Sequence, residues 1–213
     1  MGKRATNEIA DFAGVDSNTL GAYLSNLREL RLIERDIPVT ADPTSTRKSR
    51  YRLEEPLFRF WFRYVYGQSA QLQQLGESAY EELIAPTFTE YMGPMFERVC
   101  QLRLPSLFAN PFQAVGYWWH KQHELDVVGL ATDGTVVAGE CKYTSRAMHE
   151  GDLADLEESA GVLEWTPPDG STLDYHYCCF CRSGFSEGLR EMAADRDDVS
   201  LFTPRDLFAE PQA

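Results

Sequence analysis

The sequence predicts an α/β protein (α+β in arrangement), with a small helical part that ends in a hairpin and a larger part built on a mixed central sheet. Its 213 residues are enough for one large or two small domains. Charge divides the chain, since residues 1–53 carry nine Lys+Arg and seven Asp+Glu (net +2), whereas residues 54–213 carry eleven and twenty-six (net −15). Short β-rich runs alternate with helical patterns in the second part. We therefore predict one domain over 1–53, an aromatic helical connector over 54–92 and a second domain over 93–213.

The composition is acidic and poor in lysine. The chain has 33 Asp+Glu against 20 Lys+Arg, a net charge of −13. The lysines are Lys3, Lys48, Lys121 and Lys142. Such a surface stays hydrated in concentrated salt, where charge repulsion is screened, so we predict a halophilic host. An acidic protein of an ordinary cytoplasm is the alternative.

Several classes of protein are excluded. No run of about 18 apolar residues occurs, so we expect no membrane partner. The first residues lack the apolar segment of a signal peptide, and an odd number of cysteines (five) favours reduced thiols in the cytoplasm. The phosphate-binding motif Gly-x4-Gly-Lys-Ser/Thr is absent, so we expect no nucleotide cofactor and no ATPase activity in this chain.

The first domain begins with two short helices. Residues 6–13 form the first, residues 14–16 the turn, and Ser17 or Asn18 caps the second. An apolar stripe at helical spacing turns the second helix toward a core, and it consists of Leu20, Tyr23, Leu24, Leu27 and Leu30. A strand over 32–35 and a basic returning strand over 47–53 follow.

Helix, turn, helix and basic hairpin together are typical of a winged helix-turn-helix domain, whose second helix can enter a major groove. DNA is therefore the predicted partner. The candidate DNA-binding residues on the second helix and the wing are Asn18, Thr19, Arg28, Arg47, Lys48 and Arg50. The alternative is a winged helix that makes protein contacts alone.

The connector is strongly aromatic. Residues 56–66 predict a helix buried between two domains, with Arg59 and Arg63 at its wetter edge. A second helix over 77–84 is stopped by Pro86, and a third runs over 88–104 with a bend at Gly93 and Pro94.

The segment 123–143 predicts a β-hairpin around Thr132-Asp133-Gly134. A three-residue loop pairs Ala131 with Thr135 and sets Asp126 opposite Glu140, so that one face carries Glu124, Asp126, Glu140 and Lys142. A two-residue loop would instead set Asp126 opposite Cys141 and separate these side chains.

Two carboxylates at cross-strand distance repel each other unless a cation lies between them. Hard oxygen ligands favour Mg²⁺ or Mn²⁺, and such an ion can activate a water molecule at a phosphate. The alternative is a set of surface charges on an exposed sheet. The other positions of the two strands are apolar on both faces, which argues against an exposed sheet, because burying a charge among apolar residues is costly.

These residues resemble a known family. Asp126, thirteen residues and then Glu140-Cys141-Lys142 is similar to the PD-(D/E)XK nuclease core. Residues 116–119, 124–128, 139–142 and 182–185 resemble the C-terminal domain of archaeal AAA-type ATPases, and residues 57–64 resemble their middle region. In that family an ATPase domain normally precedes the winged helix, and this chain starts almost where the winged helix would. A fragment, a split gene and a stand-alone descendant all fit the sequence.

The resemblance implies a restriction-endonuclease-like αβββαβ core with a mixed central sheet. It implies Asp126 and Glu140 as metal ligands, the main-chain carbonyl of Cys141 as a further ligand, Lys142 as catalytic lysine and Glu97 as the carboxylate of the first core helix. Leu125 stands where the literal motif has proline. The strands expected after the first core helix are 114–119, the hairpin, 174–181 and 199–202, with helices over 150–163, 186–194 and after 203.

Three functions fit these expectations. The first is a magnesium-dependent deoxyribonuclease positioned by a winged helix. The second is a non-catalytic DNA-binding or regulatory module, which the charge of −15 over 54–213 favours. The third is a subunit that docks on a separate ATPase through the helix over 56–66.

Overall fold

The computed structural model describes residues 5–209. The chain divides into two compact units, one up to Phe88 and one from Thr89. The finer division at 53 and 92 stays a prediction. Among the residues described, no helix is long and apolar enough to cross a membrane.

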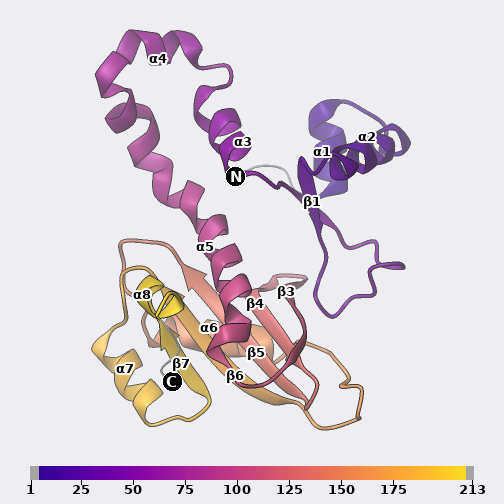
Figure 1. Ribbon diagram of the computed structural model, residues 1–213, viewed down its shortest axis with the longest axis vertical. Helices are drawn as coiled ribbons and strands as arrows, with labels where there is room; N and C mark the ends of the chain where they lie inside the picture. Colours follow the sequence, from indigo (N-terminus) through magenta and orange to yellow (C-terminus); the bar gives the residue numbers. More distant parts are fainter. Residues whose placement is uncertain (1–4, 210–213) are drawn as a thin grey trace. The chain divides into compact units, whose positions relative to one another are not determined.

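The first unit starts with helices α1 (Thr6–Ala13) and α2 (Ser17–Glu29), followed by strands β1 (Ile33–Asp36) and β2 (Arg50–Leu53) (Figure 1). The predicted cap of α2 is wrong. Asp16 is the capping residue, and its Oδ1 accepts hydrogen bonds from the main-chain nitrogens of Asn18 and Thr19, both at 3.0 Å. Its extended backbone brings the carboxylate over the first free N–H groups of the helix.

The core of this unit is smaller than the stripe on α2 predicted. Ala10, Leu20 and Leu24 are buried together, with partly buried neighbours that include Ile33 and Tyr51. Tyr23 and Leu30, expected in the core, are 55% and 67% exposed. The small unit has too few elements to cover a wide face of α2.

The β1–β2 hairpin is antiparallel, with Ile33 opposite Leu53 and Asp36 opposite Arg50. Its second strand begins at Arg50, three residues later than predicted. Arg35 explains the difference, because its guanidinium donates to Ser49 Oγ at 2.8 Å and to the carbonyl of Thr46 at 2.9 Å. These bonds hold the segment before Arg50 as a loop.

The connector is helical, but of the aromatic side chains described over residues 56–66 only Tyr64 is buried, and most of the others are exposed. Helix α3 (Pro56–Phe60) continues as a π-helix over Trp61–Val65, and then α4 (Ser69–Leu75), a 3-10 turn (Gly76–Ser78) and a π-helix (Tyr80–Ile84) lead into α5 (Ala85–Leu107). We call the exposed residues of the first helix the aromatic stripe, which consists of Leu57 (73% exposed), Phe58 (39%), Trp61 (48%), Phe62 (53%) and Tyr66 (66%). The prediction of a buried helix with Arg59 and Arg63 at the wet edge is therefore wrong, since both arginines are less exposed than the stripe.

Helix α5 also differs from the prediction. Pro86 stops no helix, because the π-helix Tyr80–Ile84 runs directly into α5 and the helical backbone continues through this residue. The helix runs on through Gly93 and Pro94 to Leu107, and the division between the two units falls inside it.

The second unit is built on one mixed sheet. Its strands are β3 (Phe112–His120), β4 (His123–Ala131), β5 (Thr135–Lys142), β6 (Asp174–Cys181) and β7 (Val199–Phe202), and they lie in that order. The β3–β4 and β4–β5 pairs are antiparallel, whereas β5–β6 and β6–β7 are parallel. The predicted bounds of β6 and β7 are confirmed.

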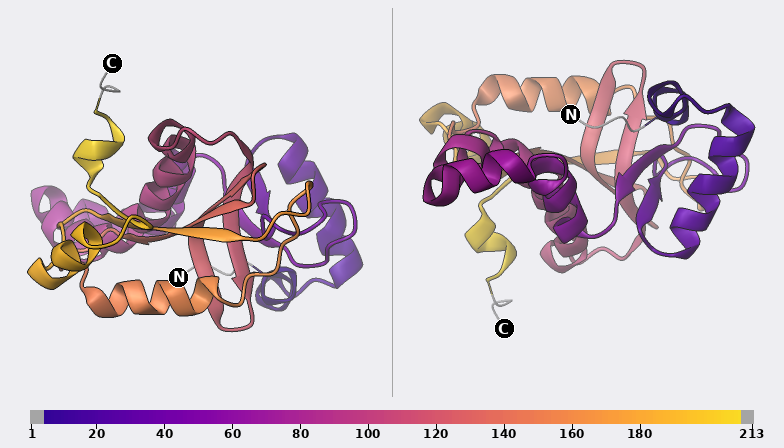
Figure 2. Two further views of the ribbon diagram at one scale, coloured as in Figure 1. Left: turned by 90° about the horizontal axis from the view of Figure 1, so that it is seen from below. Right: turned by 90° about the horizontal axis from the view of Figure 1, so that it is seen from above.

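Helices cover both faces of this sheet. Helix α6 (Glu150–Ala160) connects β5 to β6, α7 (Glu187–Ala194) connects β6 to β7, and α8 (Pro204–Leu207) follows β7. Helices α5 and α6 lie on opposite faces (Figure 2). On the α5 face, Phe96, Cys100 and Leu104 pack with Val127 and Val137. Because side chains alternate along a strand, the intervening residues of β4 and β5 face α6.

Candidate active site

The β4–β5 hairpin has the predicted register. Val127 pairs with Gly139 and Leu130 with Val136, and three residues (132–134) separate the strands. Gly134 has φ 88°, the left-handed conformation that such a loop requires. Continued by one residue, this register sets Asp126 opposite Glu140.

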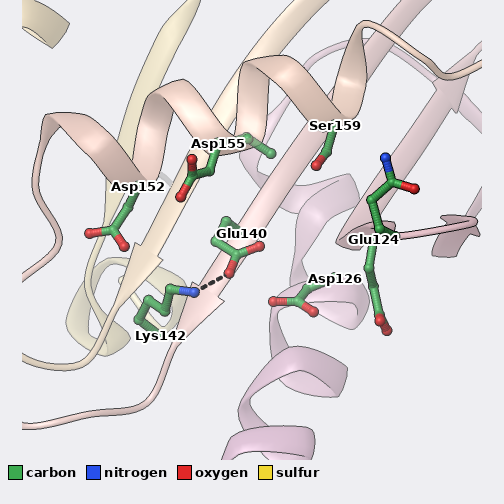
Figure 3. A pocket seen from close by; sticks show the side chains of 9 residues that line it. Glu124, Asp126, Glu140, Lys142, Asp152, Asp155 and Ser159 are labelled. Carbon is green, nitrogen blue, oxygen red and sulfur yellow. Dashed lines mark hydrogen bonds and ion pairs between the residues drawn. The ribbon is translucent and has the colours of Figure 1, made fainter.

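A pocket of about 300 Å³ opens on the α6 face of the hairpin. It is lined by all four predicted residues, Glu124, Asp126, Glu140 and Lys142, together with Gln122, Asp152, Asp155, Leu156 and Ser159. The carboxylates of Asp126 and Glu140 and the ammonium of Lys142 lie side by side between the strands and α6 (Figure 3). The structure therefore brings together the hairpin residues that the sequence singled out.

Asp126 sits in an irregular part of β4. Gly116 pairs with Val128 and Trp118 with Leu125, so Asp126 and Val127 oppose Tyr117 alone. Two residues opposite one define a β-bulge, a feature that re-aims side chains beside active sites. The paired residues of β4 and β5 also end at Val127, so the main chain of Asp126 pairs with neither neighbouring strand.

Asp126 is held by contacts from two other elements. Its Oδ2 accepts a hydrogen bond from the main-chain nitrogen of Cys141 at 2.9 Å. Its main-chain carbonyl accepts one from Nε2 of Gln101, on α5, at 2.7 Å. These contacts fix both the carboxylate and the peptide of a residue that the sheet leaves unpaired.

Negative charge dominates the site and shifts the pKa values of its carboxyl groups. Burial, together with the charges of Glu140, Glu97 and Glu124, holds the pKa of the Asp126 carboxyl well above its usual range. Burial also raises the pKa of Glu140, against the opposing effect of its ion pair with Lys142. Burial alone would lower the pKa of Lys142, but Glu140 and Asp126 raise it, so the ammonium stays charged. Five carboxylates and one lysine line the pocket.

Helix α6 contributes a wall that the sequence analysis missed. Asp152, Asp155 and Ser159 all line the pocket. Asp152 is only 8% exposed and accepts hydrogen bonds from the main-chain nitrogen of His149 at 2.9 Å and from Arg146 at 3.1 Å. The signal was their spacing of three and four residues, which places polar side chains on one helical face beside Leu156.

Glu97 lies near the site without lining the pocket. It is half-buried on α5, on the opposite side of the sheet from α6, and four residues before Gln101. Its charge is close enough to raise the pKa of Asp126 and adds to the effect of burial on the thiol of Cys141. Glu97 therefore acts on Asp126 through its charge, from the face of the sheet opposite the pocket.

The donor set suits a hard divalent cation only in part. Asp126 and Glu140 offer carboxylate oxygens, and neutralising them would relieve the repulsion that raises the pKa of Asp126. The side chain of Cys141 packs against the core on the α5 face. Its main-chain carbonyl is therefore the atom of this residue that could bind a cation. Within residues 5–209, no three His, Cys, Asp or Glu side chains are grouped so as to hold a metal ion. Two carboxylates and a carbonyl therefore need oxygens from water or a ligand to complete a coordination shell.

The predicted DNA-binding residues lie in the first unit. Asn18, Thr19 and Arg28 are exposed on α2, Arg47 and Lys48 are exposed in the hairpin loop, and Arg50 is half-buried on β2. Thr19 and Arg28 are nine residues apart, which is roughly half a turn out of phase on an α-helix. One surface of α2 therefore does not present both of them.

Comparison with known proteins adds relatives whose function is not known. Residues 61–153 match the model of DUF234, described as archaeal and bacterial proteins of unknown function. An uncharacterized protein of Methanocaldococcus jannaschii, MJECL04, is 31% identical over 135 residues, which are 61% of this chain and 30% of that protein. The chain thus spans under a third of that relative's length. No solved structure matches. The segment similar to DUF234 includes Glu97, Asp126, Glu140 and Lys142.

Proposed function

We propose that the second unit is a restriction-endonuclease-like PD-(D/E)XK domain that hydrolyses phosphodiester bonds in DNA with Mg²⁺ or Mn²⁺. The observation that carries the proposal is the grouping of Asp126, Glu140 and Lys142 at the irregular end of the β4–β5 hairpin. The order α5-β3-β4-β5-α6-β6 supports it, because it is the αβββαβ order of that core.

The residues of the pocket have distinct roles in this proposal. Asp126, Glu140 and the carbonyl of Cys141 would hold the cation. A bound cation supplies an acidified water molecule and offsets charge at the phosphate. Lys142 donates hydrogen bonds to the attacking water or to a phosphate oxygen, a role that its raised pKa supports by keeping it charged.

The first unit would bring this domain to DNA. Two helices followed by a hairpin support a winged helix-turn-helix, and the exposed Arg47 and Lys48 in the hairpin loop suit contacts with phosphates. The candidate surface therefore combines the hairpin loop with one side of α2.

A second candidate is a non-catalytic module that docks on a separate protein, such as an ATPase subunit of the archaeal AAA type. Two observations favour it. The pocket has five carboxylates against one lysine, which repels a phosphate when no cation is bound. The aromatic stripe is also a row of exposed apolar side chains of the kind found at protein interfaces.

Titration calorimetry with MnCl₂ in concentrated salt tests the proposal. We expect saturable binding to the wild type, loss of binding in Asp126→Asn, and unchanged binding in Glu158→Gln, which removes an exposed carboxylate of α6 outside the pocket. Binding is then followed by cleavage assays on single-stranded and duplex DNA. Absence of cleavage by a wild type that binds DNA would support the non-catalytic module instead.

A further inference from the structure

Gln101 is an unusual residue for the interior of this protein. Among the described residues, the buried polar or charged side chains are Gln101 (3% exposed) and Asp152 (8%). Asp152 lines the pocket, whereas Gln101 lies behind it on α5. A buried amide is costly unless it is hydrogen-bonded, so its partners indicate what it does.

The partner of Gln101 is Asp126, the one residue of β4 that is paired with neither neighbouring strand. The bulge between β3 and β4 and the end of the β4–β5 pairing leave Asp126 outside both ladders. Gln101 Nε2 donates to the carbonyl of Asp126 at 2.7 Å, and Arg98 donates to Gln101 Oε1 at 3.4 Å. A carbonyl accepts only from the NH₂ side of an amide, so this contact also fixes the orientation of the side chain.

The neighbours of Gln101 anchor it firmly. Cys100 and Leu104, on the same helix, are fully buried and pack against Val127 and Val137 of the sheet. The amide therefore projects from a rigid base into the gap beside Asp126.

We propose that Gln101 is a positioning residue, which holds the peptide of Asp126 in the bulge and so aims its carboxylate at Glu140 and the main-chain nitrogen of Cys141. The expected effect of Gln101 on metal affinity rests on the proposed function, whereas its effect on the position of the Asp126 carboxylate does not. Without Gln101 the carbonyl of Asp126 loses this donor, so we expect its peptide to tilt and the bond from Cys141 to Asp126 Oδ2 to weaken.

The test compares Gln101→Met, which keeps the size of the side chain and removes its donor, with Leu104→Val, which loosens the packing of α5 without touching Asp126. Amide hydrogen exchange in metal-free protein is the first readout. We expect exchange at the Cys141 amide to rise about tenfold in Gln101→Met, with no such rise at Val137, and no selective change in Leu104→Val. Equal changes at Cys141 and Val137, or none at Cys141, would overturn the positioning role.

Calorimetry with MnCl₂ is the second readout. We expect Gln101→Met to weaken binding about tenfold, as is typical when the residue that orients a metal ligand is lost. A selective change at Cys141 together with a wild type that binds no Mn²⁺ would retain the positioning role and reject the proposed function. Unchanged Mn²⁺ affinity in Gln101→Met would confine the role of Gln101 to the geometry of the bulge.

Discussion

The two hairpins of this protein use charge in opposite ways. In β1–β2, Arg52 lies between two acidic side chains, with an ion pair to Glu34 and one to Asp36 at 3.0 Å. In β4–β5, the continued register sets the like charges of Asp126 and Glu140 opposite each other, with Lys142 as their cationic neighbour in the pocket. The first arrangement stabilises its hairpin. In the second arrangement the two carboxylates repel each other. Such destabilising charge is typical of a functional site rather than of a purely structural sheet.

The largest effect expected concerns Lys142. Lys142→Ala removes the cation of the second hairpin, so we expect cleavage of DNA to fall at least a hundredfold, the usual effect of losing a group that stabilises developing charge. DNA affinity is expected to stay within about twofold, because one half-buried lysine contributes little beside the basic first unit. Single-turnover cleavage and a binding assay measure the two quantities.

Lys121→Ala is the matched control, since Lys121 is exposed and outside the pocket. Equal losses of cleavage and binding in Lys142→Ala would contradict the assigned role.

The second effect concerns the compensated hairpin. Arg52→Met leaves Glu34 and Asp36 without their shared cation, and the side chain of Arg52 is only 11% exposed. We expect a loss of about 2 kcal/mol of local stability, since removal of one partner strands the other charges. Amide exchange at Glu34 and Asp36, which belong to the hydrogen-bonded pairs of this ladder, is expected to rise about thirtyfold, with no change in β4–β5. The exposed Arg28 provides the control, Arg28→Met, and protected β1–β2 amides in Arg52→Met would show that the pairs do not stabilise the hairpin.

The third effect is a gain of stability, in contrast to the loss expected for Arg52→Met. Because burial raises the pKa of Asp126 above its ordinary 3.8, the folded protein holds this proton more tightly than the unfolded chain does. The stability of the wild type therefore falls as the pH rises from the ordinary carboxyl pKa through the raised one. Asp126→Asn removes this penalty, and in metal-free buffer we expect its Tm to exceed that of the wild type by about 3 °C at pH 7.5.

The same comparison at pH 4 is expected to give nearly equal Tm values, since both proteins are then neutral at this position. A lower Tm for Asp126→Asn at pH 7.5 would mean that the carboxylate stabilises the fold.

The smallest effect concerns the loop of the first hairpin. Arg47→Ala with Lys48→Ala removes two exposed cations, so we expect DNA affinity to fall at every sequence. The slope of log K against log salt is expected to decrease by about two. Arg190→Ala with Arg205→Ala removes the same charge from exposed positions of the second unit. An unchanged salt slope in the loop variant would remove the loop from the DNA contact.

Local rules predicted much of the fold and the centre of the site. The turn at Thr132-Asp133-Gly134 sets the register of its hairpin, so the positions of Asp126 and Glu140 followed from loop geometry. The helix expected after residue 203 is confirmed as α8, where Asp206 Oδ2 accepts from the main-chain nitrogen of Thr203 at 2.7 Å. Such features depend on residues close in sequence.

Features that depend on distant residues were missed. An aromatic helix is ordinarily buried, but nothing in the first unit covers the aromatic stripe, and composition carries no information on that. The contact of Gln101 with Asp126 joins residues 25 apart and depends on a bulge that no local pattern marks. The spacing of Asp152, Asp155 and Ser159 places them on one face of α6, but only the packing of that helix on the sheet brings this face to the pocket.

The three-residue turn of the β4–β5 hairpin has an evolutionary consequence. Near the turn, both faces of β4 and β5 carry buried apolar side chains. A shift of the strand pairing by one residue would therefore still bury hydrophobic side chains. The hydrophobic pattern therefore does little to protect the register, and turn length alone keeps Asp126 and Glu140 together. Within the turn, substitutions are expected to be tolerated best at Thr132, because Gly134 has φ 88° and Asp133 accepts hydrogen bonds from the main-chain nitrogen of Thr135 and from Asn110. Gain or loss of a single codon there, about 17 Å along the strand from Asp126, would dismantle the site in a protein that still folds.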